Sequence, residues 1–242
     1  MIVLYRIYQI CFALPVLIVL TIITALVTAV GSVLFNGRWW GYYPPHIWAK
    51  AWCVLMFVRV RVSGRENINT GTSYVFVANH QGAYDIFSIY GYLDHNFKWM
   101  MKKSLRKIPF VGLACEKAGH IFVDNSSSAA VLHTFHGAEH TLKDGDSLVV
   151  FPEGSRTFTG KMGRFKRGAY QLSREFGLAL VPVTIDGAFQ VLPRTRFLPR
   201  YGTIKLTIHH PIPAPAPNAD LQPVMKQTFE IINESLPQRF RS

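Results

Sequence analysis

Cysteine and acidic residues are scarce in this 242-residue sequence. The three cysteines, Cys11, Cys53 and Cys115, match no metal or redox spacing, so there is no disulfide framework and we expect a reducing, cytoplasm-facing domain. Asp and Glu number 14 against 26 Lys and Arg, a formal net charge of +12. Such a balance suits nucleic acid, an anionic membrane or a negatively charged substrate. Because 49% of the residues are hydrophobic, the composition favours a membrane and argues against nucleic acid.

Charge is absent from residues 11–35, and Arg6 is the only charged residue before them. About 20 apolar residues suffice to cross the hydrocarbon core, so this run is long enough to span a membrane. A cleaved signal peptide fits poorly, because its apolar region is usually about 7–15 residues and its start more basic. We therefore expect an N-terminal membrane-anchoring helix.

A second apolar stretch, residues 47–58, follows two prolines and contains Lys50. It is too short and too charged to span comfortably, which indicates an interfacial helix or the return leg of a hairpin that dips into one leaflet. Basic residues follow the first stretch at Arg38, Lys50, Arg59, Arg61 and Arg65. By the positive-inside rule, everything after that stretch stays in the cytoplasm. Whether residues 11–35 span or dip is open at this point.

From about residue 57 the pattern becomes that of an α/β domain, so we expect membrane-anchoring helices over 1–56 and a catalytic domain over 57–242. Predicted strands are Val58–Val62, Tyr74–Ala78, Lys98–Met101, Ile121–Val123, Ser147–Phe151, Ala179–Ile185 and Thr203–Ile208. Predicted helices cover 86–93, 127–142 and 165–176, and a last helix, with Asn218 as its cap, runs to about Ser235. This alternation predicts a mixed, largely parallel sheet flanked by helices.

The first chemistry-bearing segment is Asn79–Asp85, a polar turn between a predicted strand and a predicted helix. An imidazole followed five residues later by a carboxylate suits a general base and its orienting partner. A plain helix cap would use the same residue types. On one regular helix the two side chains would not share a face, so pairing requires His80 before the helix and Asp85 in or near its first turn.

The second segment is Phe151–Thr157, which contains Gly154 and Arg156 after a predicted strand. A glycine-containing turn with an arginine and nearby cations suits a phosphate, although a solvated basic loop would look similar. No Gly-Lys-Ser/Thr follows, so it is not a P-loop. The flanking cations are Lys102, Lys103, Lys161, Arg164, Lys166 and Arg167.

Two other types of site receive little support. His133, His136 and His140 share one helical face, but no acidic residue completes an HExxH arrangement, so we predict a polar helix face and no metal site. Ser155 has no G-x-S-x-G elbow around it and is not expected to act as a nucleophile.

Taken together, three blocks resemble the lysophospholipid acyltransferases, in particular the 1-acyl-sn-glycerol-3-phosphate acyltransferase family. Residues 79–85 match the family's HxxxxD motif, 151–156 its FPEG-S/T-R motif and 181–183 its VPV-type block. The resemblance covers about residues 58–210. One position departs from it, because Asn125 stands where the second block, G-x-x-F-I-D-R, has arginine. That departure removes one expected phosphate contact.

The resemblance implies direct acyl transfer from a thioester to the sn-2 hydroxyl of lysophosphatidate, giving phosphatidate for phospholipid biosynthesis. His80 would be the general base and Asp85 its orienting partner, with no metal and no cofactor beyond the acyl-CoA or acyl carrier protein thioester. Lysophosphatidate would be held by Glu153, Gly154 and Arg156 with the cations Lys103, Lys166 and Arg167. The expected location is a bacterial-type inner membrane, with the catalytic domain on its cytoplasmic side.

Three alternatives remain at this level. Another lysolipid, such as a lyso-ornithine lipid or lysophosphatidylglycerol, fits the same chemistry, and Asn125 keeps this alternative open. A catalytically silent protein that binds anionic membranes fits the charge. A metal-dependent lipid phosphatase is the third.

Overall fold

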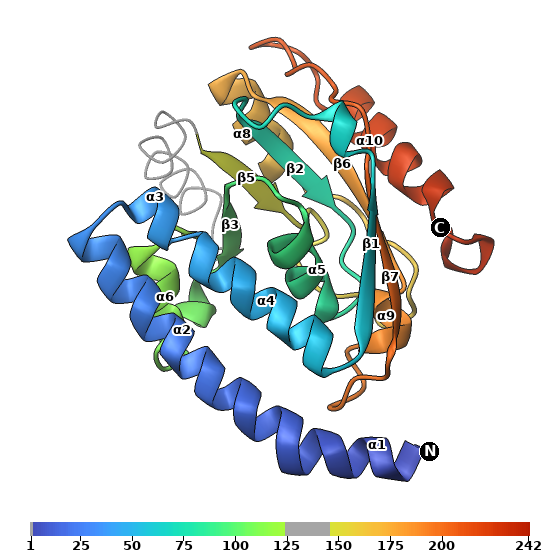
Figure 1. Ribbon diagram of the computed structural model, residues 1–242. Coiled ribbons are helices and arrows are strands. Elements are labelled where there is room, and N and C mark those ends of the chain that lie inside the picture. Colours follow the sequence, from blue (N-terminus) through green and yellow to red (C-terminus); the bar gives the residue numbers. More distant parts are fainter. Residues whose placement is uncertain (1, 124–145) are drawn as a thin grey trace.

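The structure, a computed structural model, describes residues 2–123 and 146–242 (Figure 1). Its helices are α1 (Ile2–Tyr8), α2 (Leu14–Leu34), α3 (Gly37–Trp40), α4 (Tyr43–Leu55), α5 (Tyr84–Tyr92), α6 (Val111–Lys117), α8 (Gly168–Phe176), α9 (Ala188–Val191) and α10 (Gln222–Ser235), with a π-helical turn η1 (Gln9–Ala13) and short 3₁₀ turns η2 (Arg65–Asn67), η3 (Lys103–Lys107) and η4 (Gln238–Phe240). Its strands are β1 (Val58–Ser63), β2 (Tyr74–Ala78), β3 (Phe97–Lys102), β4 (Ile121–Val123), β5 (Ser147–Val150), β6 (Ala179–Asp186) and β7 (Gly202–Ile208).

The seven strands form one sheet in the order β1-β7-β6-β2-β5-β3-β4. Strands β2 to β6 are parallel, β7 is antiparallel to β6, and β1 is parallel to β7. The predicted mixed, largely parallel sheet is therefore confirmed. We call the end of the sheet where β2 to β6 finish, and where β1 and β7 begin, the carboxyl edge. The helix predicted over 127–142 lies outside the described residues.

The two faces of the sheet have separate cores because side chains alternate along each strand. Tyr74, Phe76 and Ala78 of β2 pack in the core that α4 and α5 cover. Val75 and Val77 pack in the other core, beneath α8 and α10. β2 is buried along its whole length and thus forms a rigid base for the turn that follows it.

The N-terminal helix is longer than the charge-free run. It extends without interruption from Ile2 to Leu34, 33 residues, and by length and composition it could cross a membrane. The π-helical turn η1 comes directly before Pro15, where Leu14 donates a hydrogen bond to Gln9 O, five residues back. Pro15 has no N–H to donate, so the irregular turn adjusts the helix beside it.

This helix stays against the α/β domain along its length, and α4 returns beside it (Figure 1). Near its start, Tyr5 Oη donates to Met56 O at 2.7 Å and Gln9 Nε2 donates to Pro199 O at 3.0 Å. Midway, Trp48 Nε1 of α4 donates to Thr21 Oγ1 at 2.8 Å. Beyond it α2 packs against α6. The two apolar stretches therefore form a hairpin that shares its core with the sheet.

A buried histidine connects this hairpin to the sheet. The backbone N–H of Trp99 donates to His120 Nδ1 at 3.2 Å, so the hydrogen of the neutral ring sits on Nε2, which lies 3.2 Å from Tyr90 Oη. Tyr90 Oη donates in turn to Gly41 O at 3.0 Å. Burial, together with the charge of Lys98, lowers the pKa of His120 to about 3. The imidazole is therefore held neutral in a chain of three hydrogen bonds.

The start of the last helix corrects one prediction. α10 begins at Gln222 and its N-cap residue is Leu221, so Asn218 is not the cap. The N–H of Gln222 donates instead to Asp220 Oδ1 at 3.1 Å, and Pro223 in the first turn supplies a helix-compatible φ angle.

Candidate active site

The turn after β2 is fixed by a reciprocal amide pair. Asn79 Nδ2 donates to Ile185 O at 2.9 Å, and the N–H of Ile185 donates to Asn79 Oδ1 at 2.7 Å. Ala83 N donates to Leu192 O at 3.3 Å, which ties the far side of the turn to the segment after α9. β6 and α9 thus hold both ends of the turn that carries His80.

His80 and Asp85 are paired as the spacing requires. Nδ1 of His80 lies 2.7 Å from Oδ2 of Asp85, with His80 ahead of α5 and Asp85 in its first turn. The same Oδ2 accepts a second hydrogen bond from Gly82 N at 2.8 Å. The Asp85 carboxylate is fully buried, whereas the imidazole is partly accessible. The predicted geometry of the pair is therefore confirmed.

The carboxylate fixes the ring in a useful tautomer. Because Asp85 accepts the hydrogen of Nδ1, the neutral His80 carries its lone pair on Nε2. Within the described residues, no group hydrogen-bonds to Nε2. The site thus presents a proton acceptor at the carboxyl edge with a buried negative charge behind it, as general-base chemistry needs.

Glu153 links the turn to the loop after β5. Its Oε1 accepts from His80 N and its Oε2 from Gly163 N, both at 2.7 Å. Burial raises the pKa of the Glu153 carboxyl to about 7. Its predicted contact with glycerol phosphate stays a prediction, and what the structure adds is a positioning role beneath His80.

The loop 151–157 reaches the same place because β5 lies next to β2, with Val77 beside Val150. Thr157 N donates to His80 O at 3.0 Å, and Lys166 N to Pro152 O at 3.0 Å. Gly154 has a φ of +73°, and a Cβ on it would lie 2.8 Å from Lys166 Nζ. The absence of a side chain at Gly154 thus lets the Lys166 ammonium lie over the turn.

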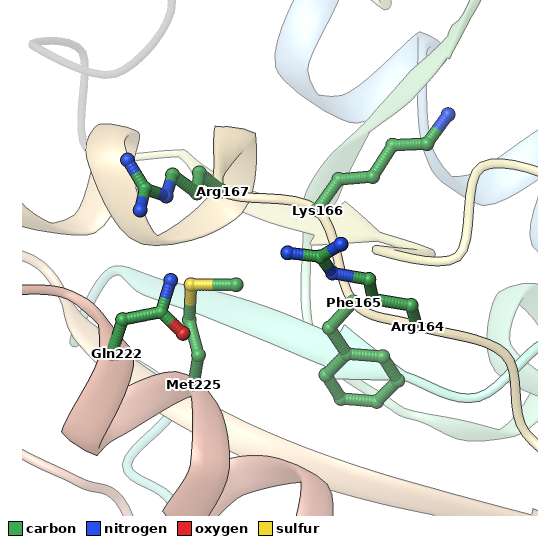
Figure 2. A pocket seen from close by; sticks show the side chains of 6 residues that line it. All are labelled: Arg164, Phe165, Lys166, Arg167, Gln222 and Met225. Carbon is green, nitrogen blue, oxygen red and sulfur yellow. The ribbon is translucent and has the colours of Figure 1, made fainter.

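The structure separates cations that the sequence grouped together. Arg164, Lys166 and Arg167 all line a hollow of about 400 Å³, but Lys166 Nζ lies over Gly154, whereas Arg167 is the N-cap residue of α8. Figure 2 shows both guanidinium groups near Gln222 and Met225 of α10, with the Lys166 ammonium pointing away. The predicted phosphate-binding set therefore falls into two groups.

The remaining predicted site residues are described by the segment of the chain in which each lies. Arg156 lies in the loop after β5 and Lys103 begins η3 directly after β3, so both are at the carboxyl edge. Asn125 and the three histidines His133, His136 and His140 lie outside the described residues. What each of these residues binds stays a prediction.

One aromatic residue that the sequence did not single out contacts His80. The phenyl ring of Phe151 stacks on the His80 imidazole, with ring centroids 4.0 Å apart. The only signals in the sequence were its place at the head of the FPEG block and at the end of the predicted strand Ser147–Phe151.

Comparison with known proteins defines the class. The family model described as Acyltransferase matches residues 59–186, more than half of the chain, so the chain belongs to this acyltransferase family. The matched region contains the turn at 79–85 and the loop at 151–157.

Individual relatives agree with that assignment. The chain is 30% identical over 172 residues to the chloroplastic 1-acyl-sn-glycerol-3-phosphate acyltransferase of Arabidopsis thaliana, covering 69% of this chain and 48% of that protein. It is 31% identical over 164 residues to the 1-acyl-sn-glycerol-3-phosphate acyltransferase of Saccharomyces cerevisiae, covering 64% of this chain and 52% of that protein. The chain thus spans about half the length of these relatives.

A solved structure matches almost the whole chain. The crystal structure of the 1-acyl-sn-glycerophosphate acyltransferase PlsC from Thermotoga maritima has a TM-score of 0.78 and 26% identity. The match covers 95% of this chain and 92% of that one, so it includes the N-terminal hairpin as well as the sheet.

Proposed function

We propose that this protein transfers an acyl group from a thioester to the sn-2 hydroxyl of lysophosphatidate, giving phosphatidate for phospholipid biosynthesis. The observation that carries the proposal is the 2.7 Å contact between His80 and a fully buried Asp85 at the carboxyl edge. The substrate comes from the relatives, whose names specify 1-acyl-sn-glycerol-3-phosphate acyltransferases.

In this reaction Nε2 of His80 takes the proton of the acceptor hydroxyl as its oxygen attacks the thioester carbonyl carbon. The imidazolium that forms is stabilised by Asp85, whose charge is buried beside Nδ1. When the tetrahedral intermediate collapses, the C–S bond breaks and the leaving thiolate takes the proton back from His80. A positioned base of this kind contributes about 10²–10⁴-fold.

The acceptor phosphate binds, in this proposal, beside the loop after β5. Lys166 lies over Gly154, and Arg156 comes two residues after that glycine. An ammonium and a guanidinium from one loop region suit a phosphate dianion. Lys103, at the end of β3, approaches from the same edge of the sheet.

The acyl donor, acyl-CoA or acyl carrier protein thioester, also carries phosphate, and we assign its phosphate to the hollow at Arg164 and Arg167. Within the described residues, neither guanidinium forms an ion pair. The hollow is flanked by the starts of α8 and α10, and helix starts favour anions. The backbone N–H of Lys166, between the two arginines, donates to Pro152 O and so connects the hollow to the loop beside His80.

The membrane face in this proposal is the hairpin together with the carboxyl edge. The outer side of α1 and α2 exposes large apolar side chains, including Val3, Ile18 and Val33. Among the described residues after α4, the exposed large apolar side chains are Phe57, Ile86, Leu105, Ile108, Phe110, Leu113, Phe158, Phe197 and Tyr201. Each lies in a segment that leaves β2, β3, β5 or β6 at the carboxyl edge, or enters β1 or β7 there. This distribution supports a membrane surface at that edge.

We infer that the hairpin lies within one leaflet, because both of its ends contact the domain that carries His80. The bacterial-type inner membrane and the cytoplasmic side of the catalytic domain belong to the same proposal, on the charge asymmetry of the sequence. Vesicle co-sedimentation tests the surface. Truncating the 98%-exposed Phe197 to Ala should weaken binding about tenfold, whereas Gln227→Ala on α10 should not.

A panel of lysolipids tests the substrate. Purified protein is given lysophosphatidate, lysophosphatidylglycerol and a lyso-ornithine lipid, each with acyl-CoA and with acyl carrier protein thioester. The proposal expects phosphatidate as the main product. Turnover of another lysolipid alone would identify a different acceptor, and no turnover of any would favour a membrane-binding protein without catalysis.

A further inference from the structure

The imidazole of His80 has an aromatic partner on its flat face. Its ring lies almost parallel to that of Phe151, with centroids 4.0 Å apart and 9° between the planes. The Trp99 ring stacks 5.5 Å away from Phe151, at 24°. Phe151 thus contacts the His80 ring directly and is itself supported by a second, buried aromatic ring, that of Trp99.

The stack follows from the order of the strands. β2, β5 and β3 are neighbours, with Val77 beside Val150 and Trp99 beside Val149. Phe151 follows Val149 by two residues, so their side chains leave the same face of the sheet. His80, Phe151 and Trp99 therefore come from three adjacent strands, and the rigidity of the sheet sets their separation.

The charge of the His80 ring changes during the proposed reaction. An aromatic face carries a negative quadrupole and attracts a cation centred within about 6 Å of it. The neutral imidazole gains little from that field, whereas the imidazolium gains more. An interaction that grows as the proton is transferred accelerates the step rather than only strengthening ground-state binding.

We propose that Phe151 is a positioning residue for acyl transfer: it holds the His80 ring in the plane where Nδ1 faces Asp85 and stabilises the imidazolium through its face. This inference rests on the proposed function, since it needs His80 to be the base. Asp85 acts at the edge of the ring and Phe151 at its face, so the two contacts do not compete for the same side of the ring.

Two substitutions separate this role from space filling. Phe151→Leu keeps an apolar side chain of similar reach without an aromatic face, and Phe151→Tyr keeps the face. The Leu variant should lower kcat about 3- to 30-fold with little change in the KM for the acceptor. The acidic limb of its kcat–pH profile should move to lower pH by roughly half to one and a half units, because the imidazolium loses a stabilising contact. The Tyr variant should keep both properties near wild type.

A purely structural role gives a different pattern, in which both variants follow thermal stability and neither moves the acidic limb. That pattern, or a Leu variant with wild-type kcat and pH profile, would overturn the inference. Should the wild type lack acyl transfer, the proposed function fails and the stack is tested separately by NMR titration of the His80 ring. There a lower midpoint in the Leu variant supports the contact with the imidazolium, and an unchanged midpoint contradicts it.

Discussion

Oδ2 of Asp85 lies 2.7 Å from Nδ1 of His80 and receives a second hydrogen bond from the backbone of the turn between them. Within the described residues, Oδ1 has no hydrogen-bond partner, so a single oxygen carries the whole interaction. The pair is thus built to orient one tautomer and to place one buried charge beside the imidazole.

Replacing that charge without changing the shape isolates its effect. In Asp85→Asn the amide oxygen can still accept both hydrogen bonds, while the negative charge beside the imidazolium is lost. We expect kcat to fall about 10- to 100-fold with the fold intact, since a charged hydrogen bond contributes more than a neutral one. Steady-state kinetics and circular dichroism measure the two properties. A variant with wild-type kcat would show that the charge of Asp85 has no part in the reaction.

Gly82 sets the shape of the turn by having no side chain. A Cβ there would lie 2.6 Å from Ala188 O and 2.7 Å from Leu192 O. Gly82→Ala should therefore push the turn away from α9, lowering the free energy of unfolding by about 1–3 kcal/mol and reducing activity. Gly71→Ala is the matched control, because a Cβ at Gly71 meets nothing within 4 Å, and its effect should stay within about 0.5 kcal/mol. Equal stability of the two variants would contradict the close packing of the turn.

The neutral His120 predicts how stability depends on pH. Its pKa is lowered to about 3 in the folded protein from a reference value of 6.5, so the unfolded chain takes up this proton first as pH falls. Stability is therefore lost as pH falls from about 6.5 towards 3, by an amount on the order of several kcal/mol. In His120→Gln this contribution should vanish, so the free energy of unfolding, measured with denaturant, should depend less on pH.

The exposed His210 provides the control for that measurement. His210→Gln should leave the pH dependence as in wild type. If the His120 variant lost stability in acid as steeply as wild type, the burial of a neutral His120 would not be the source of the pH dependence.

The assignment of the donor phosphate to Arg164 and Arg167 predicts that their loss raises the KM only for donors that carry phosphate. If Arg164 and Arg167 hold the donor phosphate, the double Ala variant should raise the KM for acyl-CoA about tenfold or more and leave that for acyl-pantetheine, which has no phosphate, unchanged. The KM for lysophosphatidate should also stay unchanged. Lys226→Ala removes one positive charge from α10 next to Met225 and serves as the control. Equal losses with both donors would place the phosphate elsewhere.

Much of the fold could be predicted from the sequence because the strands are short apolar runs between polar turns. All seven predicted strands are present, and the sheet has the expected mixed, largely parallel order. The first helix was harder to delimit, since the charge-free run that predicted it begins only at Cys11. Arg6 and Gln9, which precede that run, both donate to Pro199 O, a contact nearly 200 residues away that local pattern could not supply.

The pairing of His80 and Asp85 could be predicted because it depends on five consecutive residues and a helix start. The division between Lys166 and Arg167 could not, since it depends on where α8 begins and how α10 packs against it. The stacking of Phe151 on His80 depends on the register between β2 and β5. Contacts within one turn can thus be predicted from the sequence, whereas contacts between strands require the structure.

The rate of phosphatidate formation from lysophosphatidate and an acyl thioester, measured for wild type and for His80→Ala in the same vesicles, tests the central claim most directly. The account predicts phosphatidate from the wild type and a fall in kcat of about 10²–10⁴-fold in the variant, with unchanged thermal stability. A His80→Ala protein that forms phosphatidate within twofold of the wild-type rate would contradict it.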